Sequence, residues 1–198
     1  MFFRIHLTVS SVLSSYKVDS IVVPIPLNRW IAFTSLAIFG TAADLLSKQW
    51  IFSWRGLPGT NPPYWLIENY VGIETAINTG ALFGMGAGYG MFFAGMSILA
   101  ATAIVVWLFG FRAAHSLWLT VALGMVMGGI FGNLYDRLGI WYSSDMPCPL
   151  GVRDWILLRY GQYTWPNFNI ADSLLVCGAV MLAWHSFFPP QSTAEQKG

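Results

Sequence analysis

Long stretches without charged residues divide the chain into apolar segments. Asp, Glu, Lys and Arg are absent from residues 75–111, 113–135 and 173–194. A bilayer core about 30 Å thick requires about 20 helical residues to cross it, and a helix satisfies its own backbone hydrogen bonds where lipid cannot. The pattern therefore predicts four membrane-spanning helices, at about 31–52, 90–111, 116–137 and 169–188.

Several Trp and Tyr residues lie near the ends of the predicted spans. Their amphipathic rings prefer the headgroup level of a bilayer, although ordinary core packing would explain any one of them. The residues are Trp30, Trp50, Trp54, Tyr89, Trp107, Trp118, Tyr135 and Trp184. Four spans place both termini on one side of the membrane, and a small excess of Lys and Arg on that side favours the cytoplasm.

Most residues outside the predicted spans fall in two loops on the side opposite the termini. Residues 64–77 are rich in aromatic and β-branched types and predict a surface strand or hairpin. A second strand is predicted at 154–160, within the loop 138–168. The expected fold class is an all-α membrane protein, with four transmembrane helices and a small β-containing extracytoplasmic region.

Composition and charge agree with a membrane protein. Hydrophobic residues make up 56% of the 198 residues and charged residues only 10%, against about 25% in soluble domains. The formal net charge of +1 offers no excess of basic groups for phosphates, so we expect no nucleic-acid partner. The two cysteines, Cys148 and Cys177, are too few for a disulfide framework.

Ionisable residues inside the predicted spans require a reason, because burying a charge in lipid is costly. Asp44 and Lys48 lie four residues apart on the first helix, with the acid first, which favours an ion pair on one helix face. One interpretation is a self-sufficient pair near the interface, with Lys48 extending toward the headgroups. The other is a functional site.

Small residues form a stripe on the third helix. Gly124, Gly128 and Gly132 recur every four residues, which lets a neighbouring helix approach closely. Asp136 follows at the next step, and Asn133 lies three residues before it on the same face. Packing explains the glycines, but it does not explain Asn133, Asp136 and Arg137 together.

The start of the last helix carries the same Asn-x-x-Asp spacing, in Asn169 and Asp172. Asn167 or Asn169 could cap this helix, and Asp172 could favour its positive N-terminus. Asp154, in the preceding loop, reads by itself as a solvated charge. The glycine-rich segment 78–90 lacks Gly-Lys-Ser/Thr, so it indicates flexible backbone at the membrane surface and not a nucleotide loop.

Five motifs occur in an order that resembles the lipoprotein signal peptidases, also called signal peptidase II, which are four-helix membrane aspartic proteases. They are Asp44-x-x-Ser-Lys48, Asn78-x-Gly-Ala-x-Phe83, Gly128-Gly-x-x-Gly-Asn133-x-x-Asp136-Arg137, Val152-x-Asp154-Trp155 and Phe168-Asn169-x-Ala-Asp172. The chain departs from the family pattern at Ile77, where many members have Arg, at Trp155, where Phe is usual, and in a longer stretch at 138–153.

This resemblance implies roles for individual residues. Asp154 and Asp172 become the catalytic dyad. The supporting and substrate-binding residues become Asp44, Lys48, Asn78, Gly80, Asn133, Arg137 and Asn169. Asp136 becomes a structural partner. The other structural positions are the glycines of the packing stripe on the third helix, Gly124, Gly128 and Gly132.

The resemblance also implies the chemistry and its setting. Two carboxylates that share one proton can activate water and protonate a leaving nitrogen, so we expect an aspartic endopeptidase without a metal or cofactor. The implied substrates are diacylglyceryl-modified bacterial prolipoproteins, cleaved before the lipidated cysteine. The implied location is the bacterial cytoplasmic (inner) membrane, with the active site on the extracytoplasmic side. Membrane lipids are expected partners, and no obligate protein partner is expected.

Three parts of the chain and two alternatives complete the expectations. An N-terminal extension is predicted at 1–28, a four-helix membrane peptidase domain at 29–188 and a flexible C-terminal tail at 189–198. The competing function is a small transporter or proton relay that uses intramembrane carboxylates. A purely structural helix bundle is a third interpretation. The histidines are scattered and show no metal-ligand spacing.

Overall fold

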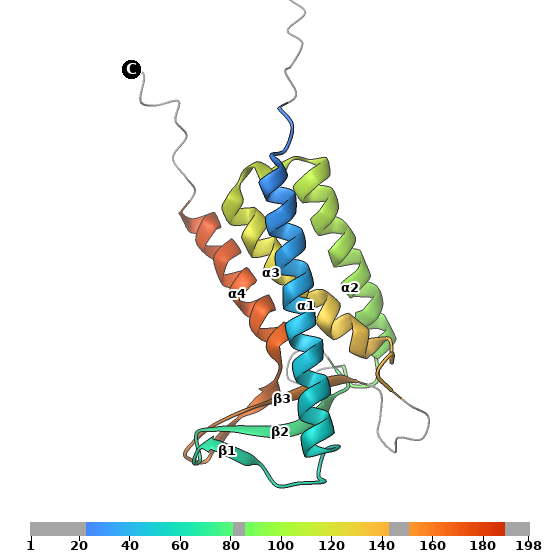
Figure 1. Cartoon of the computed structure of the whole chain (residues 1–198), viewed down its shortest axis with the longest axis vertical. Helices are drawn as coiled ribbons and strands as arrows, with labels where there is room; N and C mark the ends of the chain where they lie inside the picture. The colour runs from blue at the N-terminus through green and yellow to red at the C-terminus, as the bar shows by residue number, and fades with distance from the viewer. Residues whose placement is uncertain (1–22, 81–85, 143–150, 189–198) are drawn as a thin grey trace, which may run out of the picture.

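Four long helices lie side by side, with a small sheet at one end of them (Figure 1). The computed structural model describes residues 23–80, 86–142 and 151–188. Within these ranges, four helical segments are long and apolar enough to cross a membrane: α1 (Leu27–Arg55), α2 (Gly90–Val105) continued by the π-helical turn η3 (Val106–Gly110), α3 (Leu117–Arg137) and α4 (Ile170–Phe187). The four predicted spans are confirmed.

Several predictions concern residues outside the described ranges. They include the C-terminal tail 189–198, residues 1–22 of the N-terminal extension and residues 143–150 of the long loop. Phe83 of the second motif and Cys148 also lie outside. The described chain enters α1 at Leu27, inside the extension that the sequence predicts at 1–28.

The sheet joins two hairpins that are far apart in the sequence. Its antiparallel order is β1-β2-β3-β4, with β1 at Tyr64–Ile67, β2 at Val71–Asn78, β3 at Val152–Tyr160 and β4 at Tyr163–Phe168. The central pairing aligns Ala76 with Asp154 and Asn78 with Val152. The chain between these strands runs through α2 and α3, so the pairing brings the start of β3 back beside the end of β2.

The sequence predicts the hairpin β1–β2 and the strand β3, but it does not predict β4. The hairpin β1–β2 fits the predicted segment 64–77, and β3 extends the predicted strand 154–160 by two residues. Pro166 lies in β4, an edge strand whose register with β3 shifts between Trp165 and Phe168. Proline is tolerated at such an edge irregularity because no ladder hydrogen bond needs its missing N–H.

The glycine stripe of α3 lets its neighbours approach closely. A Cβ on Gly124 would lie 3.0 Å from the Cβ of Leu36, and one on Gly128 would lie 3.2 Å from the Leu36 carbonyl oxygen. On Gly132 it would collide with the carboxylate of Asp44. The stripe therefore serves packing, as predicted, and its last member also makes room for a polar side chain on α1.

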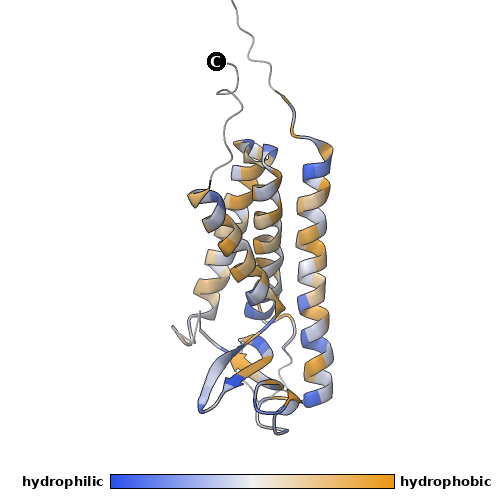
Figure 2. Ribbon diagram, turned by 90° about the vertical axis from the view of Figure 1, so that its left-hand side faces the viewer, coloured by the Kyte–Doolittle hydropathy of each residue, from blue (hydrophilic) through white to orange (hydrophobic). Residues whose placement is uncertain are grey.

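Apolar side chains cover the outside of the helices as well as the core. Phe33, Leu123 and Met127 are buried between helices, whereas Phe39, Leu46 and Met91 are about as apolar and point outward. Figure 2 shows apolar residues along the length of the helices and many of the polar residues at the sheet end. Helices that are apolar all round are expected of membrane spans.

The two ends of the helix bundle differ in the elements that lie there. The start of α1 and the end of α4 lie at the end opposite the sheet (Figure 1), which is the arrangement that four predicted spans require. The sheet lies at the other end, whereas the turn from η3 through η4 into α3 lies at the same end as the start of α1. This confirms the expected fold class of four transmembrane helices with a small β-containing region.

Candidate active site

Asp154, near the start of β3, and Asp172, in the first turn of α4, are linked through two amide side chains. The Asn169 side chain donates a hydrogen bond to Asp154 Oδ1 at 2.7 Å, and the Asn133 side chain donates one to Asp172 Oδ1 at 2.8 Å. Asn169 also donates to Asn133 Oδ1 at 3.1 Å. Two amides therefore connect the two carboxylates, and one strand and two helices supply the four side chains.

The start of α4 is fixed by a reciprocal cap. The Asn169 side-chain oxygen accepts from the Asp172 backbone N–H at 2.9 Å, and Asp172 Oδ2 accepts from the Asn169 N–H at 3.2 Å. The predicted helix cap is thus confirmed. These residues also have contacts beyond the cap. The Asn169 amide nitrogen donates to Asp154 and Asn133, and the other oxygen of Asp172 accepts from Asn133. Capping orients Asp172 toward the other polar groups.

Lys48 is fully buried between two carboxylates. Its Nζ lies 2.6 Å from Asp44 Oδ2 and 3.1 Å from Asp136 Oδ2, and it donates to Asn133 Oδ1 at 3.1 Å. The interpretation of an interfacial pair, with Lys48 reaching the headgroups, is therefore wrong. The ammonium group stays inside because three acceptors on α1 and α3 surround it.

The second oxygen of Asp44 contributes to the start of α4. Asp44 Oδ1 accepts from the Ala171 backbone N–H at 2.9 Å. The first N–H groups of a helix have no partner within the helix, so this carboxylate satisfies one of them. Asp44 thus joins α1 to α4 in the space that Gly132 leaves open.

Asp136 binds Arg153, a residue that sequence reasoning did not select. The Arg153 backbone N–H and Nε each donate to this carboxylate at 3.0 Å, and its terminal nitrogen donates at 2.8 Å. Arg153 is only 2% exposed. The sequence offers one signal for Arg153, which is that this charged residue directly precedes Asp154.

Asp154 is buried, so its interpretation as a solvated loop charge is wrong. Burial, and next the Asp172 carboxylate, raise the pKa of Asp154 to about 8, against opposing effects of Lys48 and of hydrogen bonds from Asn169 and Asn78. The Asp172 carboxylate is thus close enough to Asp154 to disfavour a second negative charge there.

A pocket of about 450 Å³ opens between the end of β2 and the neighbouring helices. Its lining residues are Asn78, Thr79, Gly80, Gly88, Gly90, Met91, Arg137 and Gly151. Arg137 is half-buried and is attracted to both Asp154 and Asp172. The Gly80 N–H donates to Asn78 Oδ1 at 3.0 Å, which holds the turn after β2. The predicted supporting residues Asn78, Gly80 and Arg137 therefore share one pocket.

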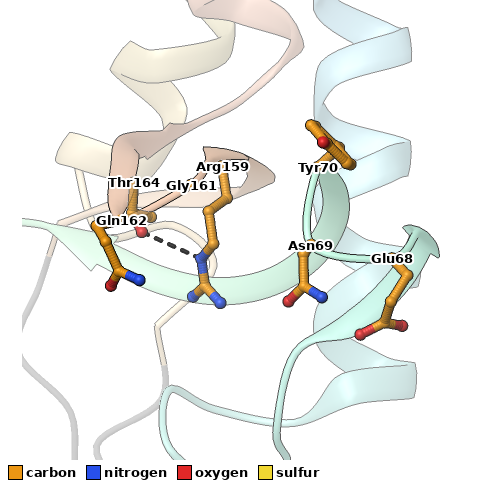
Figure 3. A pocket seen from close by; sticks show the side chains of 7 residues that line it. All are labelled: Glu68, Asn69, Tyr70, Arg159, Gly161, Gln162 and Thr164. Atoms are coloured by element: carbon orange, nitrogen blue, oxygen red, sulfur yellow. Dashed lines mark hydrogen bonds between the residues drawn. The ribbon is translucent and has the colours of Figure 1, made fainter.

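A second pocket lies at the tips of the two hairpins (Figure 3). Arg159 Nε donates to Thr164 Oγ1 at 3.2 Å, and the guanidinium group lies 4.8 Å from the centre of the Trp65 ring. None of the predicted site residues lines this pocket. Over residues 23–80, 86–142 and 151–188, no group of His, Cys, Asp and Glu is arranged to hold a metal ion. The candidate site is therefore the Asp154–Asp172 pair.

Two known proteins with similar sequences carry the name lipoprotein signal peptidase. Residues 36–188 match the family model described as Signal peptidase (SPase) II. A lipoprotein signal peptidase from Rhodopirellula baltica is 61% identical over 82% of this chain and 74% of that protein. Another, from Serratia proteamaculans, is 31% identical over 86% of this chain and 94% of that protein.

Solved structures agree with the sequence comparison. Two structures described as a bacterial membrane enzyme, solved by the in meso method at 2.3 and 1.9 Å resolution, align with TM-scores of 0.64 and 0.65. Their sequences are 26% and 25% identical to this one, over 81% and 80% of this chain. The alignments cover 93% and 94% of those chains. The family match includes all five motifs, and the chain therefore belongs to the signal peptidase II family.

Proposed function

We propose that this protein is an aspartic endopeptidase that removes the signal peptide from diacylglyceryl-modified prolipoproteins, cutting before the modified cysteine. The observation that carries the proposal is the pair Asp154 and Asp172, connected by two amides at one end of four membrane-crossing helices. The name that relatives carry supports the substrate class. We place the protein in the bacterial cytoplasmic membrane with this site on the extracytoplasmic side.

The two carboxylates take different roles at neutral pH. A pKa of about 8 keeps Asp154 protonated, so it is the acid. Asp172 accepts hydrogen bonds from the Asn133 side chain and the Asn169 N–H, and we assign it the role of base. One proton is thus shared by the pair, as hydrolysis by two aspartates requires.

The reaction then proceeds in two balanced steps. Asp172 accepts a proton from water, the water oxygen attacks the peptide carbonyl carbon, and Asp154 donates its proton to the carbonyl oxygen. In the tetrahedral intermediate, Asp154 recovers a proton from one hydroxyl group as the carbonyl reforms. The C–N bond breaks, and Asp172 passes its proton to the leaving nitrogen. The products are a carboxyl terminus and a new amino terminus.

The neighbouring pocket supplies the room for the substrate. We propose that the peptide backbone lies along Asn78 and Gly80 at the end of β2, beside Arg137. The guanidinium of Arg137 is attracted to both aspartates, so it also limits the repulsion between them. The acyl chains of the substrate stay in the bilayer, against the apolar outer faces of the helices, and the cysteine is delivered sideways to the site.

The distribution of charges argues against a proton relay. Within the described helices, Asp44, Lys48, Asp136, Arg137 and Asp172 all lie toward the sheet end. A relay requires ionisable groups through the depth of the membrane. In α3, residues 117–135 contain no Asp, Glu, Lys or Arg. The cluster therefore fits a reaction at one surface better than transport across the bilayer.

The alkaline limb of the pH profile tests the role of Asp154. We expect kcat/KM to fall as pH rises through about 8, because ionised Asp154 has no proton to donate. The unfolded chain releases this proton near pH 3.9, so the same shift lowers stability as pH rises from about 4 to about 8. Thermal unfolding is therefore measured at each pH, and a rate that keeps rising to pH 9 in folded protein contradicts the assignment.

Lipid dependence of cleavage tests the proposed function. Purified protein in lipid nanodiscs is given a prolipoprotein peptide that carries diacylglyceryl on its cysteine, and the same peptide without the lipid. We expect cleavage of the modified peptide alone, because the acyl chains hold the cysteine at the membrane surface. Equal cleavage of both peptides contradicts the substrate class. Absence of cleavage, together with proton flux in sealed vesicles, favours the relay.

A further inference from the structure

Arg153 and Asp154 are adjacent in β3 but face different parts of the protein. Consecutive strand side chains point to opposite faces of a sheet. Asp154 is bound by Asn169, the N-cap residue of α4, whereas Arg153 is bound by Asp136 at the end of α3. The start of β3 is therefore held from both faces. Arg153 occupies the unspecified position of the Val152-x-Asp154-Trp155 motif, so the motif itself assigns it no role.

The contact between Arg153 and Asp136 fixes the main chain as well as the side chain. One oxygen of Asp136 accepts from the Arg153 backbone N–H, and the other accepts from Nε and the terminal nitrogen. The guanidinium carbon also lies 5.0 Å from the centre of the Trp141 ring and 5.9 Å from that of Phe52. A rigid planar cation held this way leaves the peptide that leads into Asp154 little freedom to move.

Arg153 also completes the charge balance of a buried cluster. The cluster contains two carboxylates, Asp44 and Asp136, and two cations, Lys48 and Arg153. Lys48 alone would face both acids. Because Arg153 neutralises Asp136, Lys48 is left to donate to Asn133, which in turn binds Asp172. The cluster therefore reaches both catalytic aspartates, one through the β3 backbone and the other through Asn133.

We infer that Arg153 is a positioning residue for the dyad, acting through Asp136, and this inference rests on the proposed function. Arg153 sets the position of Asp154 through three hydrogen bonds to Asp136. It also keeps the buried cluster neutral beside the dyad. It does not touch the reacting atoms, so its loss should change kcat more than KM.

Two substitutions separate geometry from charge. Arg153→Lys keeps the charge but loses the planar two-nitrogen contact, and we expect kcat to fall about 10-fold. A misplacement of 1 Å can cost about 10²-fold, and the shift that Lys causes should be smaller than that. Arg153→Gln also leaves Asp136 with one cation fewer, and we expect a fall of about 10²-fold. KM should change less than kcat in both variants.

The pH profile supplies a readout that loose packing would not move. The charged groups around Asp154 are Asp172 on α4, Lys48 on α1 and Arg137 on α3, with Asp136 behind them. Removing the positive charge of Arg153 makes the surroundings of Asp154 more negative. The fall of kcat/KM at alkaline pH should therefore occur at a higher pH in Arg153→Gln than in the wild type. It should stay in place in Arg153→Lys.

A double variant covers the case in which Arg153→Gln does not fold. Asp136→Asn with Arg153→Gln removes one charge of each sign, so no buried carboxylate is left unpaired by the change. We expect it to fold, to keep the reduced kcat and to return the alkaline limb to the wild-type pH. Arg159→Gln, on the same strand and the same face but at the hairpin tip, is the matched control and should leave kcat unchanged.

The outcomes are distinct. Wild-type kcat and pH profile in the folded Arg153 variants, or wild-type kcat in the folded double variant, overturn the inference and leave the proposed function intact. An equal fall in kcat for Arg159→Gln also overturns it, because the effect is then general to the strand. If the wild-type protein does not cleave the modified peptide, both the proposed function and this inference fail.

Discussion

Asp154→Asn and Asp172→Asn should each abolish cleavage of a diacylglyceryl-modified prolipoprotein while leaving the fold intact. Asn keeps the shape of Asp but can neither release nor accept the catalytic proton. General acid and base catalysis contributes about 10²–10⁴-fold per group, so we expect kcat to fall at least that far in each variant. Loss of both groups should cost no more than loss of one, because they act as a unit.

The measurement is the initial cleavage rate of each purified variant beside the wild type. Glu68→Gln is the matched control, since it makes the same chemical change on an exposed carboxylate in the β1–β2 turn. Thermal unfolding of each variant separates lost chemistry from lost fold. Full activity in either folded aspartate variant would remove that residue from the dyad.

Lys48→Met should cause the largest loss of stability. Lys48 is the shared partner of Asp44 and Asp136 and also binds Asn133, all in a region closed to water. Breaking a buried ion pair by removing one partner costs about 3–5 kcal/mol, because the remaining charge is uncompensated. We expect the thermal unfolding midpoint in nanodiscs to fall sharply, or the protein not to fold at all.

Two further variants show whether charge is the cause. Asp44→Asn together with Lys48→Met removes one charge of each sign, and Asp136 keeps Arg153, so much of the stability should return. Gln49→Met changes the next, exposed position of α1 and should shift the midpoint little. A Lys48→Met variant as stable as the wild type would contradict the buried network.

The membrane architecture could be predicted because lipid imposes a simple rule on sequence. Spans appear as long runs without charge, and three of the four here contain few or no ionisable residues. The exact ends could not be predicted. α1 runs to Arg55, past the predicted end at 52, because its last turn is held by the connection to β1, where Arg55 donates to the Pro62 carbonyl.

The contacts within the candidate site could be predicted only in part. The cap formed by Asn169 and Asp172 is local and was visible as a spacing. The burial of Asp154 depends on the pairing of β2 with β3 across α2 and α3, which no local pattern encodes. The same long-range pairing places Arg153, which no local pattern singles out, against Asp136 in a buried cluster.

The roles of the two aspartates came from the family resemblance and not from the spacing alone. Asp44, Asp136, Asp154 and Asp172 are all carboxylates in or beside apolar segments. The structure distinguishes them by their partners. Asp44 and Asp136 each bind a cation directly, whereas Asp154 and Asp172 are bound by neutral amides.

Identification of the cleaved bond tests the central claim most directly. The wild-type protein in nanodiscs is incubated with the diacylglyceryl-modified peptide, and both products are identified by mass spectrometry. We predict a single cut, with the lipid-bearing cysteine as the new amino terminus and the signal peptide released in one piece. Cleavage at another bond, or an intact peptide after prolonged incubation with folded protein, would contradict the account.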